Sequence, residues 1–143
     1  MAEISSVNIE TLQKLAEYFH RNKANIKSIY EDFGEFSFDN GHGTIFLKPK
    51  NSLFKVLYVH QENSVISTVG IGGENLGLTL EELYNFYNKY AKTYSHYDDG
   101  YNYVFYSPNN INYALMIFSK EKILYGKSIL KNIDLNRFDI SLK

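Results

Sequence analysis

The segment from Tyr94 to Tyr101 holds the densest set of side chains suited to specific contacts, with Tyr97, Asp98 and Asp99 between its ends. Tyrosine is a rigid amphipathic anchor at protein interfaces, and two carboxylates suit a basic partner surface. Catalysis by the aspartate pair is disfavoured, because adjacent side chains on a strand point to opposite faces. The pattern favours a contact loop centred on Tyr97, Asp98, Asp99 and Tyr101. The alternative is a helix-to-strand turn with solvated acids.

A second acidic group, Glu31, Asp32 and Glu35, surrounds Phe33 and Gly34 at the end of the first predicted helical segment. We interpret these three carboxylates as a second, lesser contact patch. The alternative is a solvated helix end, which is the commoner role of such a run.

The histidines and the glycine-rich loop are the basis for an alternative hypothesis, in which the protein is a small enzyme or a ligand-binding protein. The four histidines, His20, His42, His60 and His96, contain no pair with the spacing of metal ligands. The Gly70–Gly77 loop matches neither phosphate-binding pattern, and no G-x-S-x-G motif surrounds a serine. In this alternative a cleft lies near that loop, and His42 or His96 acts as a general base.

The composition excludes several classes of function. The net charge of −1 leaves no basic excess to bind a nucleic-acid backbone, so no nucleic-acid partner is expected. The chain has no cysteine, which excludes disulfides, thiolate nucleophiles and Cys-ligated metals. No apolar stretch is long enough to span a bilayer, and the first residues do not resemble a signal peptide. These features predict a cytoplasmic protein with no membrane partner, cofactor or metal.

The hydrophobic pattern predicts a helical segment and then four strands in the first half of the chain. Between residues 9 and 33 apolar side chains recur every three or four positions, with Asn8 as N-cap and a break at 21–23. Alternating patterns then predict strands at 35–39, 44–48, 53–60 and 64–71. Asn40-Gly41 and the other short turns join these strands as an antiparallel meander.

The second half begins with a capping box, Thr79 and Glu82, which predicts a helix whose aromatic face continues to Tyr94. Strands at 101–106, 111–118 and 123–129 are predicted next, and the tail at 137–142 is expected to pair at a sheet edge. This order predicts an α+β fold with an N-terminal helical segment and a second helix between strands four and five. The antiparallel sheet should have six to eight strands. The length of 143 residues predicts a single domain, residues 1–143.

One part of the chain resembles a known module. The stretch from Gly77 to Leu83, followed by strands at 101–106 and 114–118 and by Ile123, is similar to the helix-then-three-strands unit of bacterial β-lactamase-inhibitor-like and outer-membrane-assembly lipoprotein modules. The likeness covers residues 70–129 and rests on a capping box and strand spacing. Those proteins carry a lipobox cysteine, which this chain lacks, so an envelope role is not implied.

In general character the whole chain resembles the cytoplasmic immunity proteins that accompany bacterial toxins, as in contact-dependent inhibition systems. Like them it is small, free of cysteine and without a catalytic motif. The resemblance implies a protein-binding inhibitory domain that occludes the active site of one cognate toxin domain. A secretion chaperone and a structural subunit that forms a homodimer are further alternatives. The expected contact residues are Tyr97, Asp98, Asp99 and Tyr101, followed by Glu31, Asp32 and Glu35.

Overall fold

The computed structural model describes residues 4–87, 89–106, 112–120, 124–125, 128–129 and 135–142. Its elements are α1 (Ile9–Arg21), α2 (Ile26–Asp32), β1 (Gly34–Asp39), β2 (Thr44–Pro49), β3 (Val56–Glu62), β4 (Val65–Gly72), α3 (Leu80–Phe86), β5 (Lys89–Ser95), β6 (Gly100–Tyr106), β7 (Tyr113–Ser119), β8 (Leu124–Tyr125), β9 (Ser128–Ile129) and β10 (Arg137–Leu142). The fold is α+β, with N-terminal helices, an eight-stranded antiparallel sheet and a helix between β4 and β5. This confirms the fold class predicted from the sequence.

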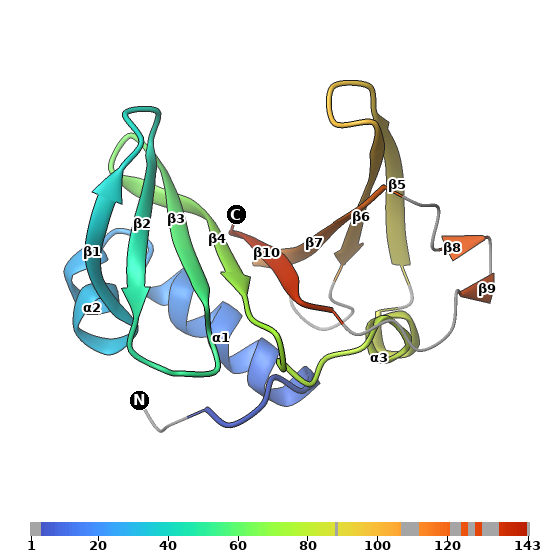
Figure 1. The fold of residues 1–143 in the computed structure, drawn as a ribbon, viewed down its shortest axis with the longest axis horizontal. Coiled ribbons are helices and arrows are strands. Elements are labelled where there is room, and N and C mark those ends of the chain that lie inside the picture. The colour runs from blue at the N-terminus through green and yellow to red at the C-terminus, as the bar shows by residue number, and fades with distance from the viewer. Residues whose placement is uncertain are drawn as a thin grey trace.

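The main sheet has the strand order β1-β2-β3-β4-β10-β7-β6-β5, and every neighbouring pair is antiparallel. The predicted meander of the first four strands is confirmed. The prediction that the tail pairs at an edge is wrong, because β10 lies at the centre between β4 and β7 (Figure 1). Its alternating side chains Phe138, Ile140 and Leu142 are buried, which an edge position would not achieve.

Two further predictions are wrong in the second half. The second helix does not reach Tyr94 but ends at Phe86, and Lys89–Ser95 is strand β5. Tyr90 and Tyr94 are four residues apart, a spacing that fits both a helix face and one face of a strand, and pairing with β6 decides for the strand. The expected single strand at 123–129 is also wrong where the structure describes it. There β8 and β9 pair with each other, because a short connection makes local pairing favourable.

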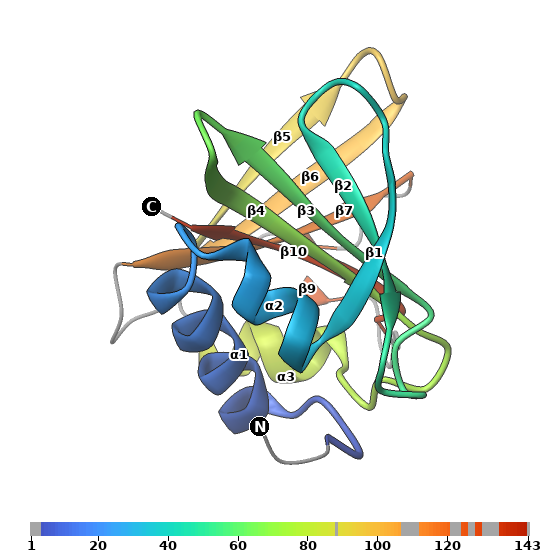
Figure 2. The same ribbon diagram turned by 90° about the vertical axis from the view of Figure 1, so that its left-hand side faces the viewer.

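The helices lie on one face of the sheet (Figure 2). Asn8 caps α1 as predicted, accepting a hydrogen bond of 2.8 Å from the Thr11 N–H, and Leu12, Leu15 and Phe19 are fully buried. The predicted break between the two N-terminal helices is confirmed at residues 22–25. Buried side chains of the helices and the sheet form one hydrophobic cluster between them. Within the described part of the chain, no helix is long and apolar enough to cross a lipid bilayer.

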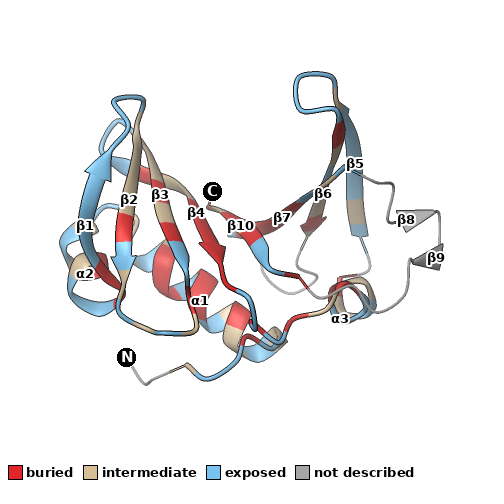
Figure 3. Cartoon of the chain, viewed as in Figure 1, coloured by how far each residue is buried: buried red, intermediate tan, exposed pale blue. Residues whose placement is uncertain are grey.

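None of the described helices lies on the other face of the sheet, which we call the open face. Strand register places Phe46, Tyr58, Gly70, Asp139 and Met116 in one row across it. The sheet bends so that the β1–β2 and β5–β6 hairpins rise on either side of β4, β10 and β7 (Figure 1). Figure 3 shows that the outer strands β1 and β5 are largely exposed, whereas the central strands β4, β10 and β7 are largely buried. Side chains of the open face are therefore displayed on a rigid, buried support.

Candidate functional site

The predicted contact loop is the tip of the β5–β6 hairpin. Tyr97 is 97% exposed, so its ring makes almost no contact within the described chain. The Ser95 hydroxyl donates to the Asp98 carboxylate at 3.1 Å, and the Asp98 N–H donates to the same hydroxyl oxygen at 3.3 Å. The Tyr94 hydroxyl donates to the Asp99 carboxylate. Side chains of the hairpin itself therefore hold both carboxylates, and the tip is ordered without a partner.

A row of aromatic rings supports this tip from below. The rings of Tyr94 and Tyr101 are 5.3 Å apart, and those of Tyr101 and Tyr103 are 6.4 Å apart. Tyr103 is fully buried and Tyr101 is half-buried. The hydrogen bond to Asp99 raises the pKa of Tyr94, so its hydroxyl keeps the proton that it donates. Tyr101 therefore connects the core to the tip, while Tyr97, Asp98 and Asp99 form its exposed end.

The second predicted group, Glu31, Asp32 and Glu35, lies where α2 joins β1, and all three side chains are exposed. Asp32 accepts a hydrogen bond from the Tyr18 hydroxyl, which ties α2 to α1. The Lys50 ammonium group donates to the backbone carbonyl of Glu31. This junction lies at the opposite end of the molecule from the β5–β6 tip (Figure 1, Figure 2). The structure therefore does not bring the two predicted groups together.

A polar cluster at the centre of the open face was missed by the sequence analysis. The Tyr58 ring lies so close to Gly70 that a Cβ on residue 70 would be 2.1 Å from two of its ring atoms. The Tyr58 hydroxyl donates to the Asp139 carboxylate and accepts a hydrogen bond of 3.1 Å from Arg137 Nη2. The guanidinium carbon of Arg137 lies 5.3 Å from the centre of the Tyr58 ring. A glycine inside a predicted strand indicates that another group packs closely against the backbone there. The sequence does not show which side chain that is.

Burial and hydrogen bonding keep the Tyr58 hydroxyl protonated. Burial, followed by the hydrogen bond to Asp139, raises the pKa of Tyr58 above the ordinary value for tyrosine. The phenol is therefore neutral at physiological pH and donates to the carboxylate while it accepts from the guanidinium.

The Tyr58 ring also ends a row of aromatic side chains that runs to the edge strand β1. The rings of Phe38 and Phe46 are stacked at 4.6 Å with only 9° between their planes, and Phe46 lies 5.6 Å from Tyr58. Phe38 is 52% exposed. We call Phe38, Phe46 and Tyr58 the aromatic strip. The Phe46 and Tyr58 rings are tilted by 44° to each other, and the strip ends on the guanidinium of Arg137.

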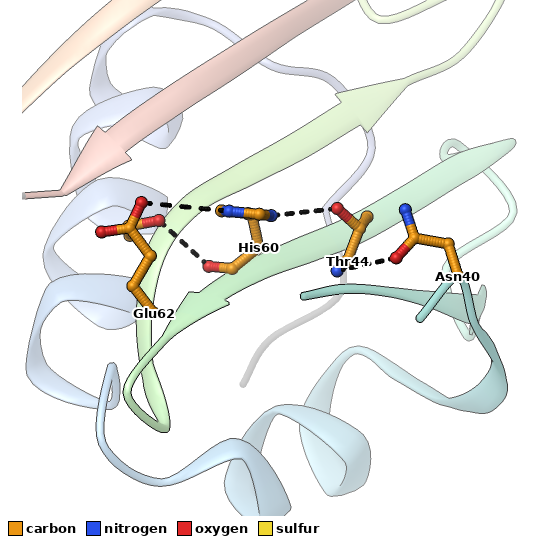
Figure 4. A network of polar contacts seen from close by, with 5 residues as sticks. Asn40, Thr44, His60 and Glu62 are labelled. Carbon is orange, nitrogen blue, oxygen red and sulfur yellow. Dashed lines mark hydrogen bonds and ion pairs between the residues drawn. The ribbon is translucent and has the colours of Figure 1, made fainter. Parts of the chain in front are cut away.

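Of the four histidines, the structure places His60 beside a hydroxyl and a carboxylate (Figure 4). His60 Nδ1 is 3.0 Å from Thr44 Oγ1, and His60 Nε2 is 3.9 Å from Glu62 Oε1. Thr44 and His60 are directly opposite each other in the β2–β3 register. The carboxylate is too distant to orient the imidazole by a hydrogen bond, as a nucleophile–base–acid triad requires. We interpret the Thr44–His60 contact as cross-strand pairing and the His60–Glu62 contact as one between neighbours within β3.

The two histidines proposed as a general base are at hairpin tips. His42 is exposed in the β1–β2 turn, where its backbone N–H donates to the Asn40 side chain at 2.7 Å. His96 is exposed at the other tip, with its ring 4.8 Å from that of Tyr94. Among the described residues there is no cluster of three or more His, Asp and Glu side chains suited to a metal ion. Neither His42 nor His96 forms an ion pair with a carboxylate of the described residues, as a general base would need.

A pocket lies beside the glycine-rich loop. Its volume is about 440 Å³, and its lining residues include Gly72, Gly73 and Glu74 from that loop. Neither His42 nor His96 lines it. Two cations, Lys55 and Arg137, line it instead, and the latter is the same Arg137 that lies over Tyr58.

The open face and the β5–β6 tip are thus two surfaces of the described chain with side chains arranged for contact. Comparison of the chain with protein-family models, with curated proteins and with solved structures finds no match.

Proposed function

We propose that this protein is a binding and inhibitory domain, an immunity protein that neutralises a cognate bacterial toxin by occluding its active site. The supporting observation is the β5–β6 tip, where the ring of Tyr97 is 97% exposed beside two carboxylates. Exposed tyrosine is a frequent anchor of protein interfaces, because its ring buries a large apolar area on binding and its hydroxyl finds a polar partner.

The internal hydrogen bonds of the tip support the same proposal. A loop that is already ordered loses less conformational entropy on binding than a mobile one, so more of its contact energy contributes to affinity. Asp98 is held by Ser95, and Asp99 by Tyr94. Both aspartates are exposed, and an exposed acidic pair suits a toxin surface rich in lysine and arginine.

The test begins with the toxin domain that copurifies with the tagged protein at moderate salt. Its enzymatic activity is measured with and without the protein, and affinity is measured by calorimetry. Asp98→Lys should weaken binding by about 100-fold, because it places like charges opposite each other. Tyr97→Ala should weaken binding by about 30-fold, as expected for an interface anchor. Both variants should lose inhibition in proportion.

The matched control is Glu17→Lys, an equal charge change at an exposed position on α1. This variant should bind and inhibit as the wild type does. Because residues 97 and 98 are exposed, none of the three variants should change the thermal unfolding midpoint appreciably. Unchanged affinity in both tip variants would remove the tip from the interface, and an unaffected toxin activity would refute the inhibitor proposal itself.

A homodimer through an edge strand stays a separate prediction. The two edges of the main sheet are β1 and β5, and most side chains of both strands are exposed. An unpaired strand edge can pair with a second copy of itself. Sedimentation equilibrium distinguishes this homodimer from the inhibitor proposal, because the homodimer needs no other protein.

A further inference from the structure

A wide-mouthed pocket of about 440 Å³ lies at the end of the sheet where β3 and β10 begin and β4 ends. Its lining residues are Lys55, Val56, Gly72, Gly73, Glu74, Asn136 and Arg137. Backbone hydrogen bonds connect its walls: the Lys55 N–H donates to the Gly72 carbonyl at 2.8 Å, and the Gly73 N–H donates to the Asn136 carbonyl at 2.9 Å. The pocket is therefore part of the sheet framework and does not need a ligand to form.

The charges of the lining favour an anion. Lys55 and Arg137 are both positive, whereas Glu74 is the one acidic lining residue. Ion pairs of the described residues, such as Lys14–Glu10 and His60–Glu62, do not involve Lys55 or Arg137. The two cations are thus not neutralised by an ion pair with a described carboxylate.

Arg137 is also held in a fixed orientation. Its guanidinium lies 5.3 Å from the centre of the Tyr58 ring and donates one hydrogen bond of 3.1 Å to the Tyr58 hydroxyl. That bond uses one of the five N–H donors of a guanidinium group. The nearest carboxylate on the same strand, Asp139, accepts from the Tyr58 hydroxyl. The aromatic ring therefore positions a cation at the pocket, as a preorganised anion site requires.

We infer that this pocket binds an oxyanion, a carboxylate or phosphate group, through Lys55 and Arg137. Val56 is 39% exposed and supplies an apolar wall, against which the carbon skeleton that bears the anion packs. Glu74 in the lining and Asp139 close to Arg137 both lower the affinity by charge repulsion, so binding depends on direct contacts with the Lys55 ammonium and the Arg137 guanidinium. The inference concerns none of the residues of the β5–β6 tip and does not depend on the proposed function.

The test uses the intact protein and three probes: acetate, inorganic phosphate and a blocked peptide with a single glutamate between apolar residues. Binding is followed in amide and guanidinium NMR spectra. We expect saturable shifts at Gly72, Gly73 and the Arg137 guanidinium, with a Kd on the order of 1 to 10 mM for the simple anions. Tighter binding of the peptide would identify a protein carboxylate as the source, and tighter binding of phosphate would identify a phosphate group.

Variants separate the pocket from general charge effects. Lys55→Met and Arg137→Met should each weaken binding at least about tenfold, and Glu74→Gln should strengthen it several-fold. The matched control Lys48→Met removes an exposed lysine of β2 that does not line the pocket, and it should bind as the wild type does. Lys55 is exposed, so its variant remains informative if Arg137→Met disturbs the Tyr58 cluster.

Three results would overturn the inference. The first is the absence of saturable shifts with any probe up to about 50 mM. The second is equal binding by the wild type and the Lys55→Met variant. The third is an equal loss of binding in Lys48→Met, which would show that only the overall charge matters. None of these results bears on toxin binding by the β5–β6 tip.

Discussion

Replacement of Gly70 by alanine disturbs the cluster on the open face without altering any of its polar side chains. The new Cβ would lie 2.1 Å from two atoms of the Tyr58 ring and 2.6 Å from its hydroxyl oxygen. Contacts this short do not occur, so the Tyr58 ring must move away from the sheet and leave both of its hydrogen-bond partners. Gly70 is not among the glycines with positive φ, so the backbone itself accepts alanine.

The expected decrease in the free energy of unfolding follows from the two hydrogen bonds that Tyr58 loses. Hydrogen bonds to charged groups contribute roughly 1.5 to 3 kcal/mol each, and Tyr58 makes one with Asp139 and one with Arg137. Because water partly replaces them at this half-buried site, we take the lower bound, about 3 kcal/mol for the pair. Alanine in place of glycine within a strand stabilises the folded state by about 0.5 to 1 kcal/mol, which offsets part of this loss. Gly70→Ala should therefore lower the free energy of unfolding by about 2 to 2.5 kcal/mol.

A double-mutant cycle tests this reasoning. In a Tyr58→Ala background there is no ring to displace, so Gly70→Ala should stabilise the protein by about 0.5 to 1 kcal/mol. Urea unfolding followed by far-ultraviolet circular dichroism measures all four proteins, and this probe does not depend on tryptophan, which the chain lacks. A similar effect of Gly70→Ala in both backgrounds would refute the steric argument. A loss in Tyr58→Phe well below that in Gly70→Ala would show that the hydrogen bonds contribute less than we expect.

Three further predictions concern stability. Thr79→Ala removes the side chain that accepts from the Glu82 N–H and should lower the free energy of unfolding by about 1 kcal/mol in urea titrations, whereas Thr79→Ser should retain most of it. Tyr113→Phe leaves the hydroxyl of Tyr87 without its 3.3 Å partner in the core and should destabilise by about 1 to 3 kcal/mol, and the double Phe variant should cost less than the two single variants summed. Burial raises the pKa of Tyr58, so the folded state holds this proton more tightly than the unfolded state; stability should be retained below pH about 10 and should fall as the pH rises further. Identical tyrosinate absorbance titrations of the folded and urea-unfolded protein would contradict this last expectation.

Local signals in the sequence predicted many of the elements. The Asn8 N-cap and the Thr79 capping box form as expected, because each needs only a side chain and a backbone N–H a few residues away. The four-strand meander also forms, since its short turns allow only antiparallel neighbours. The contact loop could be proposed from its residues alone, and the structure places it at a hairpin tip.

The hydrophobic pattern gave a wrong prediction where one spacing fits both a helix and a strand. Tyr90 and Tyr94 satisfy a helical face and a strand face equally well, and only the partner strand β6 distinguishes the two. The tail gave a weak alternating pattern in the sequence, yet it occupies the centre of the sheet. Its position depends on β4 and β7, whose side chains are distant in sequence, so no local pattern could reveal it.

The sequence by itself determined the fold class, the first helices, the meander and the acidic tyrosine-rich loop, because these depend on composition and on contacts between near neighbours. Only the tertiary structure decided that β10 joins the two halves of the sheet. That placement brings Arg137 and Asp139 to Tyr58, a residue about 80 positions earlier in the chain. The cluster and the pocket beside it are products of strand order, and strand order is set by the burial of side chains from the whole chain at once.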